Sequence, residues 1–219
     1  MDITYLGHAS FKLRGKDASV VTDPYGAMVQ TPYPNVSAEM VTVSHDHEDH
    51  NAVSRVKGTS QRPKPLVIDA PGEYEAHGIS VFGVGSFHDE KQGEERGRNT
   101  IFVIHVDEVV VAHLGDLGEM LTKQHEEALS NVDVLLLPVG GTYTIDAKQA
   151  AEVVERVDPL IVIPMHYKVA GLGKVFENLT TVDEFLEAVG ARGARREKKL
   201  TLAKGALPEE REVVVMERS

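Results

Sequence analysis

The sequence predicts an α+β protein in which two β-sheets pack against each other and helices cover the outside. Three observations lead to this fold class: short apolar segments of strand length recur along the chain, helical patterns are few, and 219 residues suffice for a substantial core. The expected strands span residues 2–6, 10–14, 18–22, 41–44, 66–69, 79–84, 100–106, 109–114, 133–137, 160–163 and 212–216.

Three segments carry helical signals. Residues 146–157 place alanines and valines on one side and end before an Asp-Pro pair, where helical backbone is disfavoured. Thr181 and Glu184 form a capping box that opens a second helix, and Gly190 is placed to end it. A third helix is expected over residues 122–129.

Composition limits the class of protein. No stretch resembles a linker or a repeat, so we expect residues 1–219 to form a single domain. With no charged-then-apolar leader and no apolar stretch of membrane-spanning length, we expect a cytoplasmic protein without a membrane partner. The absence of cysteine excludes disulfides and thiol catalysis. A net charge of −11 argues against broad nucleic-acid binding. The oligomeric state stays open, and a homo-oligomer is compatible with the sequence.

The segment Ser44–His50, which reads S-H-D-H-E-D-H, carries more functional information than any other. Imidazoles and carboxylates this close have little reason to pack together, but both bind zinc and related divalent ions. His45 and His47 project to the same side of an extended chain and can bind one ion together. Asp49 and His50 follow where the chain should turn toward a helix, which suggests a second, neighbouring ion. The alternative is a solvated, histidine-rich turn.

Three further candidate ligands, His88, Asp116 and His166, each follow a probable strand. Proteins built on sheets place functional groups at such points because the rigid strand fixes the loop that begins there.

The remaining histidines are assigned ordinary positions. His105 and His113 lie on the two arms of an expected hairpin and are interpreted as sheet residues. His77 and His125 are interpreted as surface residues.

Together these residues resemble the metallo-β-lactamase superfamily. S-H-D-H-E-D-H matches its H-x-H-x-D-H signature, and S-F-H-D, L-G-D-L-G and I-P-M-H-Y match its three later motifs in order. The segments L-G-H-A-S, T-D-P, P-G-E-Y-E, R-G-R-N-T and P-V-G-G-T-Y-T are similar to the branch containing ascorbate-6-phosphate lactonase and N-acyl-phosphatidylethanolamine phospholipase D.

The resemblance implies a four-layer αββα sandwich and a site for two divalent metal ions. It implies one ion held by His45, His47 and His88, a second held by Asp49, His50 and His166, and Asp116 bridging the two. The residue pattern alone leads to the same seven side chains without assigning them to individual ions. Zn²⁺ is the expected metal, and Mn²⁺ or Fe²⁺ would also suit the more oxygen-rich position.

Such a site predicts hydrolysis by a hydroxide shared between two ions, without a serine or cysteine nucleophile. Asp49 and Asp116 are the candidate catalytic residues, because a carboxylate that touches both metal and water can accept a proton. His8 and Asp23 are candidates to orient the ligands, since a metal-bound histidine usually donates its other N–H to a carboxylate or carbonyl. The alternatives are a turn residue before Pro24 for Asp23 and a loop or half-buried histidine for His8.

Lys91, Arg96 and Arg98 follow His88, and the two arginines are candidate substrate-binding residues. A guanidinium binds phosphate or carboxylate in a bidentate way. Neighbouring glutamates partly cancel this charge, so a flexible mixed-charge loop is the alternative. A second basic run, residues 192–199, is expected to be a solvated loop.

These features favour a metal-dependent hydrolase that acts on a small anionic ester, lactone or phosphodiester. A nuclease is the first alternative, but the chain is acidic and too short for the large inserted domain of RNA-processing relatives. A metal-binding regulatory module without turnover is the second, and it would be expected to lack a ligand. Activity on β-lactams is not expected, because substrate choice depends on the loops rather than the fold.

Overall fold

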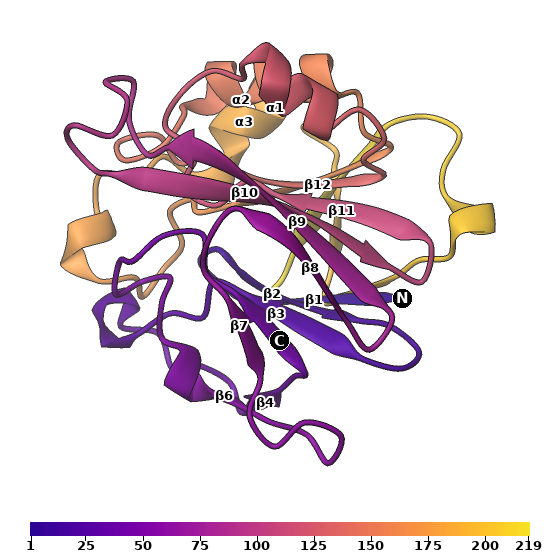
Figure 1. The fold of residues 1–219 in the computed structure, drawn as a ribbon. Helices are drawn as coiled ribbons and strands as arrows, with labels where there is room; N and C mark the ends of the chain where they lie inside the picture. The colour runs from indigo at the N-terminus through magenta and orange to yellow at the C-terminus, as the bar shows by residue number, and fades with distance from the viewer.

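The computed structural model describes residues 1–219 and contains two β-sheets packed face to face (Figure 1). In spatial order, the six-stranded sheet is antiparallel from its first to its fourth strand and parallel from its fourth to its sixth. Its strands are, in spatial order, β15 (Lys199–Thr201), β1 (Asp2–Gly7), β2 (Ser10–Arg14), β3 (Ser19–Thr22), β5 (Met40–Thr42) and β7 (Leu66–Ile68).

The eight-stranded sheet is parallel from β14 to β11 and antiparallel from β11 to β8. Its strands are β14 (Arg195–Glu197), β16 (Glu212–Met216), β13 (Ile161–Met165), β12 (Val134–Pro138), β11 (Val109–His113), β10 (Arg98–Val106), β9 (Ile79–Phe87) and β8 (Gly72–Ala76). Asp107 and Glu108 join β10 to β11 as predicted, with φ of 49° and 68°, as a two-residue hairpin turn requires.

The largest core lies between the two sheets. Because side chains alternate across a strand, Phe102 and Ile104 of β10 enter this core while Ile101 and Val103 face the other side. That other side is covered by helices α1 (Lys123–Ala128), α2 (Ala147–Val157) and α3 (Val182–Ala188), as Figure 1 shows.

The outer face of the six-stranded sheet has a thinner cover. A two-stranded ribbon of β4 (Val36–Ser37) and β6 (Val56–Lys57) packs there with the 3₁₀ turn η2 (Val53–Arg55) over a small apolar cluster. Two more 3₁₀ turns, η1 (Ala27–Val29) and η3 (Lys174–Phe176), meet in a separate cluster, and η4 (Lys204–Ala206) precedes β16. The predicted α+β sandwich is confirmed, with short turns in place of helices on this face.

All eleven predicted strands and all three predicted helices are present, but some local predictions were wrong. Thr181 precedes α3 without a side-chain capping bond, so its predicted capping box is absent. The basic run is not wholly a loop, because Arg195 begins β14 and pairs with Glu197 and Glu212. His125 was predicted at the surface but is buried. It completes a capping box at the start of α1.

The strand β8 was not predicted, because its polar sequence G-E-Y-E-A lies half-exposed at the sheet edge. None of the helices has the length and apolar character that a membrane crossing requires.

Candidate metal centre

The candidate site lies where strands of both sheets end. The segments that follow β1, β3, β5, β9, β11 and β13 carry, in that order, His8, Asp23, His45–His50, His88, Asp116 and His166. Side chains far apart in the sequence therefore meet at one edge of the sandwich, held by strands whose own positions the core determines.

Three of these residues have a left-handed backbone: His8 with φ of 56°, Asp23 with 39° and His166 with 51°. This conformation costs a non-glycine residue roughly 1–2 kcal/mol, and such strain gathers at functional sites. The backbone N–H of His166 donates to the carbonyl of His8 at 3.0 Å, which joins the ends of β1 and β13.

Gly115 brings two parts of the site into contact. A Cβ at this position would lie 2.3 Å from Oδ1 of Asn99 and 2.5 Å from Cβ of Ser44, and its φ is 55°. Only glycine fits, so the loop that carries Asp116 can press against the segment that carries His45.

The site contains two groups of candidate ligands, and a third set, Asp23 with His45 and His50, overlaps both of them. Within each group, the nitrogen and oxygen atoms lie within 4.8 Å of one another; the groups are His45, His47 and His88, and His8, Asp49, His50 and His166. Asp116 touches both, because its Oδ2 lies 3.3 Å from Nε2 of His88, His50 and His166 alike.

These residues fit a bound cation. Nε2 of His45, His50 and His166 and Oδ1 of Asp116 are buried without a hydrogen-bond partner. Unpartnered buried polar atoms are rare because each costs about 1–3 kcal/mol. A divalent ion among them would satisfy these atoms, so the cluster is able to bind metal.

The electrostatics of the cluster also suit a cation. Burial lowers the pKa of His45 to about 3 and that of His166 to about 4, so both imidazoles are neutral near pH 7. Burial alone would raise the pKa of Asp116, but His166 and His50 hold it well below its usual range. Burial would lower the pKa of His50, yet Asp116 and Asp49 raise it well above the ordinary value. The carboxylates therefore favour positive charge at this point.

Asp23 connects the two groups from behind. It is fully buried, and its Oδ2 accepts from Nδ1 of His50 at 2.8 Å and from the Ser44 hydroxyl at 2.5 Å. The Ser44 hydroxyl in turn lies 2.9 Å from Nδ1 of His45. The Asp23 carboxylate therefore positions one histidine ring of each group, directly for His50 and through Ser44 for His45. Asp23 is thus more than a turn residue before Pro24.

His8 is buried among the other members of the second group. Its Nε2 lies 3.1 Å from Oδ2 of Asp49, and its ring centroid is 4.2 Å from that of His166. It lies in the turn between β1 and β2, as the loop alternative expects, but it is buried rather than half-buried, and it contacts Asp49 closely enough to orient that carboxylate.

The conformation of the S-H-D-H-E-D-H segment differs from the prediction. The strand β5 ends at Thr42, and the chain then bends rather than staying extended. The N–H groups of His50 and Asn51 both donate to the carbonyl of His47, which makes a single turn followed by η2 instead of a helix. The bend still brings the ring centroids of His45 and His47 to 4.5 Å.

Two supporting residues were missed from the sequence. Asn99 accepts from the backbone N–H of Asp116 at 3.0 Å and donates to the carbonyl of Leu114. The Asp89 carboxylate accepts the backbone N–H groups of Lys91, Gly93, Glu95 and Arg96. These four hydrogen bonds fix the backbone of the loop after His88, in contrast to the alternative of a flexible mixed-charge loop. Both residues lie inside motifs named in the sequence analysis, Asp89 in S-F-H-D and Asn99 in R-G-R-N-T. Their roles could not be predicted because their partners are backbone groups, which a sequence motif does not reveal.

The ligand groups open into a pocket of about 360 Å³. Its outer wall includes Met28 and Val175, which are 39% and 45% exposed. Arg96 also lines this pocket, with its guanidinium 5.7 Å from the centroid of the Tyr143 ring. Arg98 does not line it but lines a neighbouring cavity that Arg96 also borders, so only one of the two predicted substrate-binding arginines reaches the metal pocket.

Comparisons with known proteins agree with this geometry. The family model described as the beta-lactamase superfamily domain matches residues 2–166. The chain is 30% identical over 225 residues to a UPF0173 metal-dependent hydrolase of Archaeoglobus fulgidus, covering 88% of this chain and 92% of that protein. It is 29% identical over 193 residues to a UPF0173 metal-dependent hydrolase of Methanopyrus kandleri, covering 76% and 84%.

Solved structures extend the comparison. A protein of Thermotoga maritima, proposed to be a Zn-dependent hydrolase of the metallo-beta-lactamase superfamily, is 41% identical with a TM-score of 0.79, covering 98% of this chain and 97% of that one. Igni18, a metallo hydrolase of Ignicoccus hospitalis, shares the fold at 23% identity and a TM-score of 0.68, covering 100% and 95%. The chain belongs to the metal-dependent hydrolases of the metallo-β-lactamase superfamily.

Proposed function

We propose that this metal-dependent hydrolase binds two divalent ions and cleaves a small anionic ester, lactone or phosphodiester. The observation that carries the proposal is the position of Asp116, whose Oδ2 lies 3.3 Å from histidines of both ligand groups. A carboxylate placed between two groups of ligands is suited to bridge two ions. The proposed ligands are His45, His47 and His88 for one ion, Asp49, His50 and His166 for the other, and Asp116 for both.

A pair of ions bound there would supply Lewis acidity and lower the pKa of a water enough for attack near neutral pH. The protein contributes the rest. Asp23 holds His50 and, through Ser44, His45, so that their free nitrogens point into the site. Asp49, at the pocket, can accept a proton from the attacking water.

The surroundings of the pocket favour a small substrate over nucleic acid. Asp46 and Glu48 are exposed at its mouth and would repel a phosphate chain. Arg96 offers a guanidinium at the same mouth that could contact a single anionic group. With the net charge of −11, this arrangement makes a nuclease the weaker alternative.

The proposal is tested with bis(p-nitrophenyl) phosphate, an aliphatic lactone and a p-nitrophenyl ester, each offered to zinc-loaded protein. We expect turnover of at least one, and a loss of at least roughly 100-fold in Asp49→Ala together with a lower zinc content. Glu48→Ala is the matched control, since Glu48 is the exposed neighbour of the buried Asp49. Full activity of Asp49→Ala with an undiminished zinc content would contradict the two-ion proposal.

A further inference from the structure

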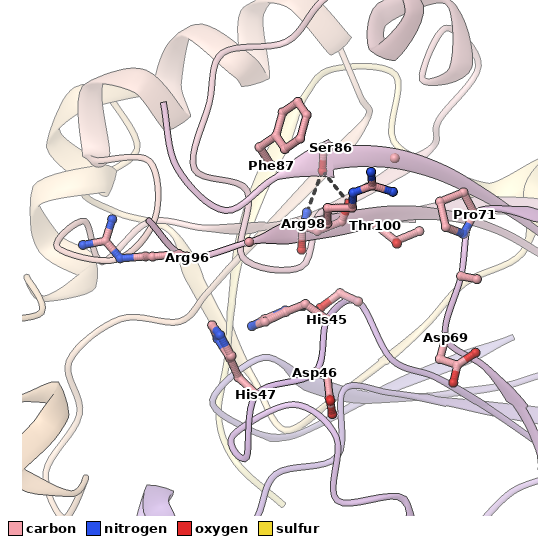
Figure 2. A pocket seen from close by; sticks show the side chains of 15 residues that line it. His45, Asp46, His47, Asp69, Pro71, Ser86, Phe87, Arg96, Arg98 and Thr100 are labelled. Carbon is pink, nitrogen blue, oxygen red and sulfur yellow. Dashed lines mark hydrogen bonds between the residues drawn. The ribbon is translucent and has the colours of Figure 1, made fainter. Parts of the chain in front are cut away.

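A second cavity, of about 580 Å³, lies beside the metal pocket. The two share Asp46, His47 and Arg96, so they adjoin at the candidate metal centre. Figure 2 shows this cavity between the two sheets. His45 and His47 lie on one side of it, the ends of β9 and β10 with Arg98 and Thr100 lie on the other, and Asp69 and Pro71 lie at the far end.

The cavity exists because the facing strands stop filling the space between the sheets. On β10, Phe102 is the last large apolar side chain on the inner face, and that face continues as Thr100 and Arg98. Their cross-strand neighbours on β9 include Gly85, which pairs with Thr100. A Cβ at Gly85 would meet only Cγ of Pro71, at 3.6 Å, so space is left open beside this glycine.

The two arginines near the site differ in what they already bind. Arg96 is engaged, since it contacts the Tyr143 ring, lies 3.8 Å from Glu95 and donates to the carbonyl of Thr142. The Arg98 side chain is exposed and has no ion pair or hydrogen bond within the protein. Its five N–H donors are therefore available to a ligand, and a guanidinium suits carboxylate and phosphate geometry in particular.

We propose that the cavity holds a carboxylate or phosphate group of the substrate, remote from the bond that is cleaved and bound by Arg98. The inference rests on the proposed function and deepens it, because it assigns the anionic group of the substrate to a separate compartment. Arg98 is then the residue that selects an anionic substrate, while Gly85 leaves the space that the group occupies. Asp46, on the side of His45 and His47, and Asp69, at the far end, would orient the anion toward Arg98 by repulsion.

The test measures binding rather than turnover. Zinc-loaded protein is titrated calorimetrically with linear dicarboxylates, from succinate to pimelate, and with monocarboxylates of the same carbon number, from butyrate to heptanoate. One carboxylate of each compound can meet the metal centre, and only the dicarboxylates carry a second for Arg98. We expect at least one dicarboxylate to bind about tenfold more tightly than its partner, which corresponds to about 1.4 kcal/mol. Matching ω-phosphonocarboxylates form a further arm, and the tighter series identifies the group as phosphate or carboxylate.

Variants assign the effect to the cavity. Arg98→Ala should remove the tenfold preference, and Gly85→Leu should remove it by filling the space. Gly85→Ala is the matched control and should keep it, since the added methyl group meets a single neighbour at ordinary contact distance. Thermal unfolding of each variant shows whether the fold is kept.

Equal affinity for paired mono- and dianions in the parent protein would overturn the inference, as would a preference that survives in both Arg98→Ala and Gly85→Leu. Because the assay needs no turnover, the two proposals fail separately. An inactive protein with the preference contradicts only the proposed function, and an active hydrolase without it contradicts only the anion compartment.

Discussion

Replacing Asp23 with asparagine should weaken metal binding without removing any ligand. The Asp23 carboxylate accepts three hydrogen bonds, from the Ser44 N–H at 2.8 Å, the Ser44 hydroxyl at 2.5 Å and Nδ1 of His50 at 2.8 Å. If His50 binds an ion through Nε2, its Nδ1 carries the hydrogen and must donate. Asparagine has one oxygen, so its amide N–H₂ group must face either His50 or Ser44, both of which then present a donor.

The magnitude follows from the lost contact. One hydrogen bond to a buried charged group contributes about 1.5–3 kcal/mol, and loss of the partner that orients a ligand typically lowers metal affinity by about 10–100-fold. Because Asp23 holds one histidine of each group, we expect both ions to bind more weakly, with the larger effect at the ion held by His50.

Zinc affinity is measured by competition with a coloured chelator in the parent protein and in Asp23→Asn. Thr42→Val is the control, because the Thr42 hydroxyl is buried on a neighbouring strand, has no hydrogen-bond partner and takes no part in the Asp23 contacts. Zinc affinities unchanged at both positions in Asp23→Asn would refute the role given to Asp23.

Three further predictions concern stability. Thr42→Val should raise the free energy of unfolding by about 1 kcal/mol, since it removes a buried hydroxyl without a partner, and urea denaturation that shows a loss would count against this. Burial would raise the pKa of Glu39, but hydrogen bonds from Thr59 and Ser19 lower it below the ordinary value of 4.5. Its ionised form therefore stabilises the fold above pH 4.5, and this contribution is lost as pH falls through the lowered folded-state pKa. Glu39→Gln should accordingly cost about 1 kcal/mol at pH 7, with the gap to the parent closing below pH 4.5; a gap independent of pH would be the contrary result. Gly118→Ala places a Cβ 2.2 Å from the carbonyl carbon of His88, so we expect a loss of about 1–3 kcal/mol and weaker zinc retention, whereas Gly85→Ala should be close to neutral.

Much of the fold was predictable because its signals are local. Alternating or continuous apolar runs marked the strands that build both sheets, and the apolar side of residues 146–157, which end before an Asp-Pro pair, marked α2. The predictions that failed depend on distant partners. β8 has polar residues because it is an edge strand, and Arg195 lies in β14 because a parallel neighbour, β16, is available 17 residues later.

The candidate site shows the same division. The seven proposed ligands could be located because each lies in a short motif or directly after a strand, and the structure brings all seven together. The bend after Thr42 could not be predicted, because contacts with Asp23 and Gly115 shape it. Arg96 and Arg98 looked equivalent in sequence, yet only Arg96 borders the metal pocket as well as the second cavity, where it contacts Tyr143 and Thr142.

The number of metal ions per chain tests the central claim most directly. Protein loaded with zinc and dialysed free of excess is analysed for metal by mass spectrometry, beside an Asp116→Ala variant. The account predicts two zinc ions per chain in the parent and one or none in the variant, because Asp116 lies between both ligand groups. A single ion in the parent, or two in Asp116→Ala, would contradict it.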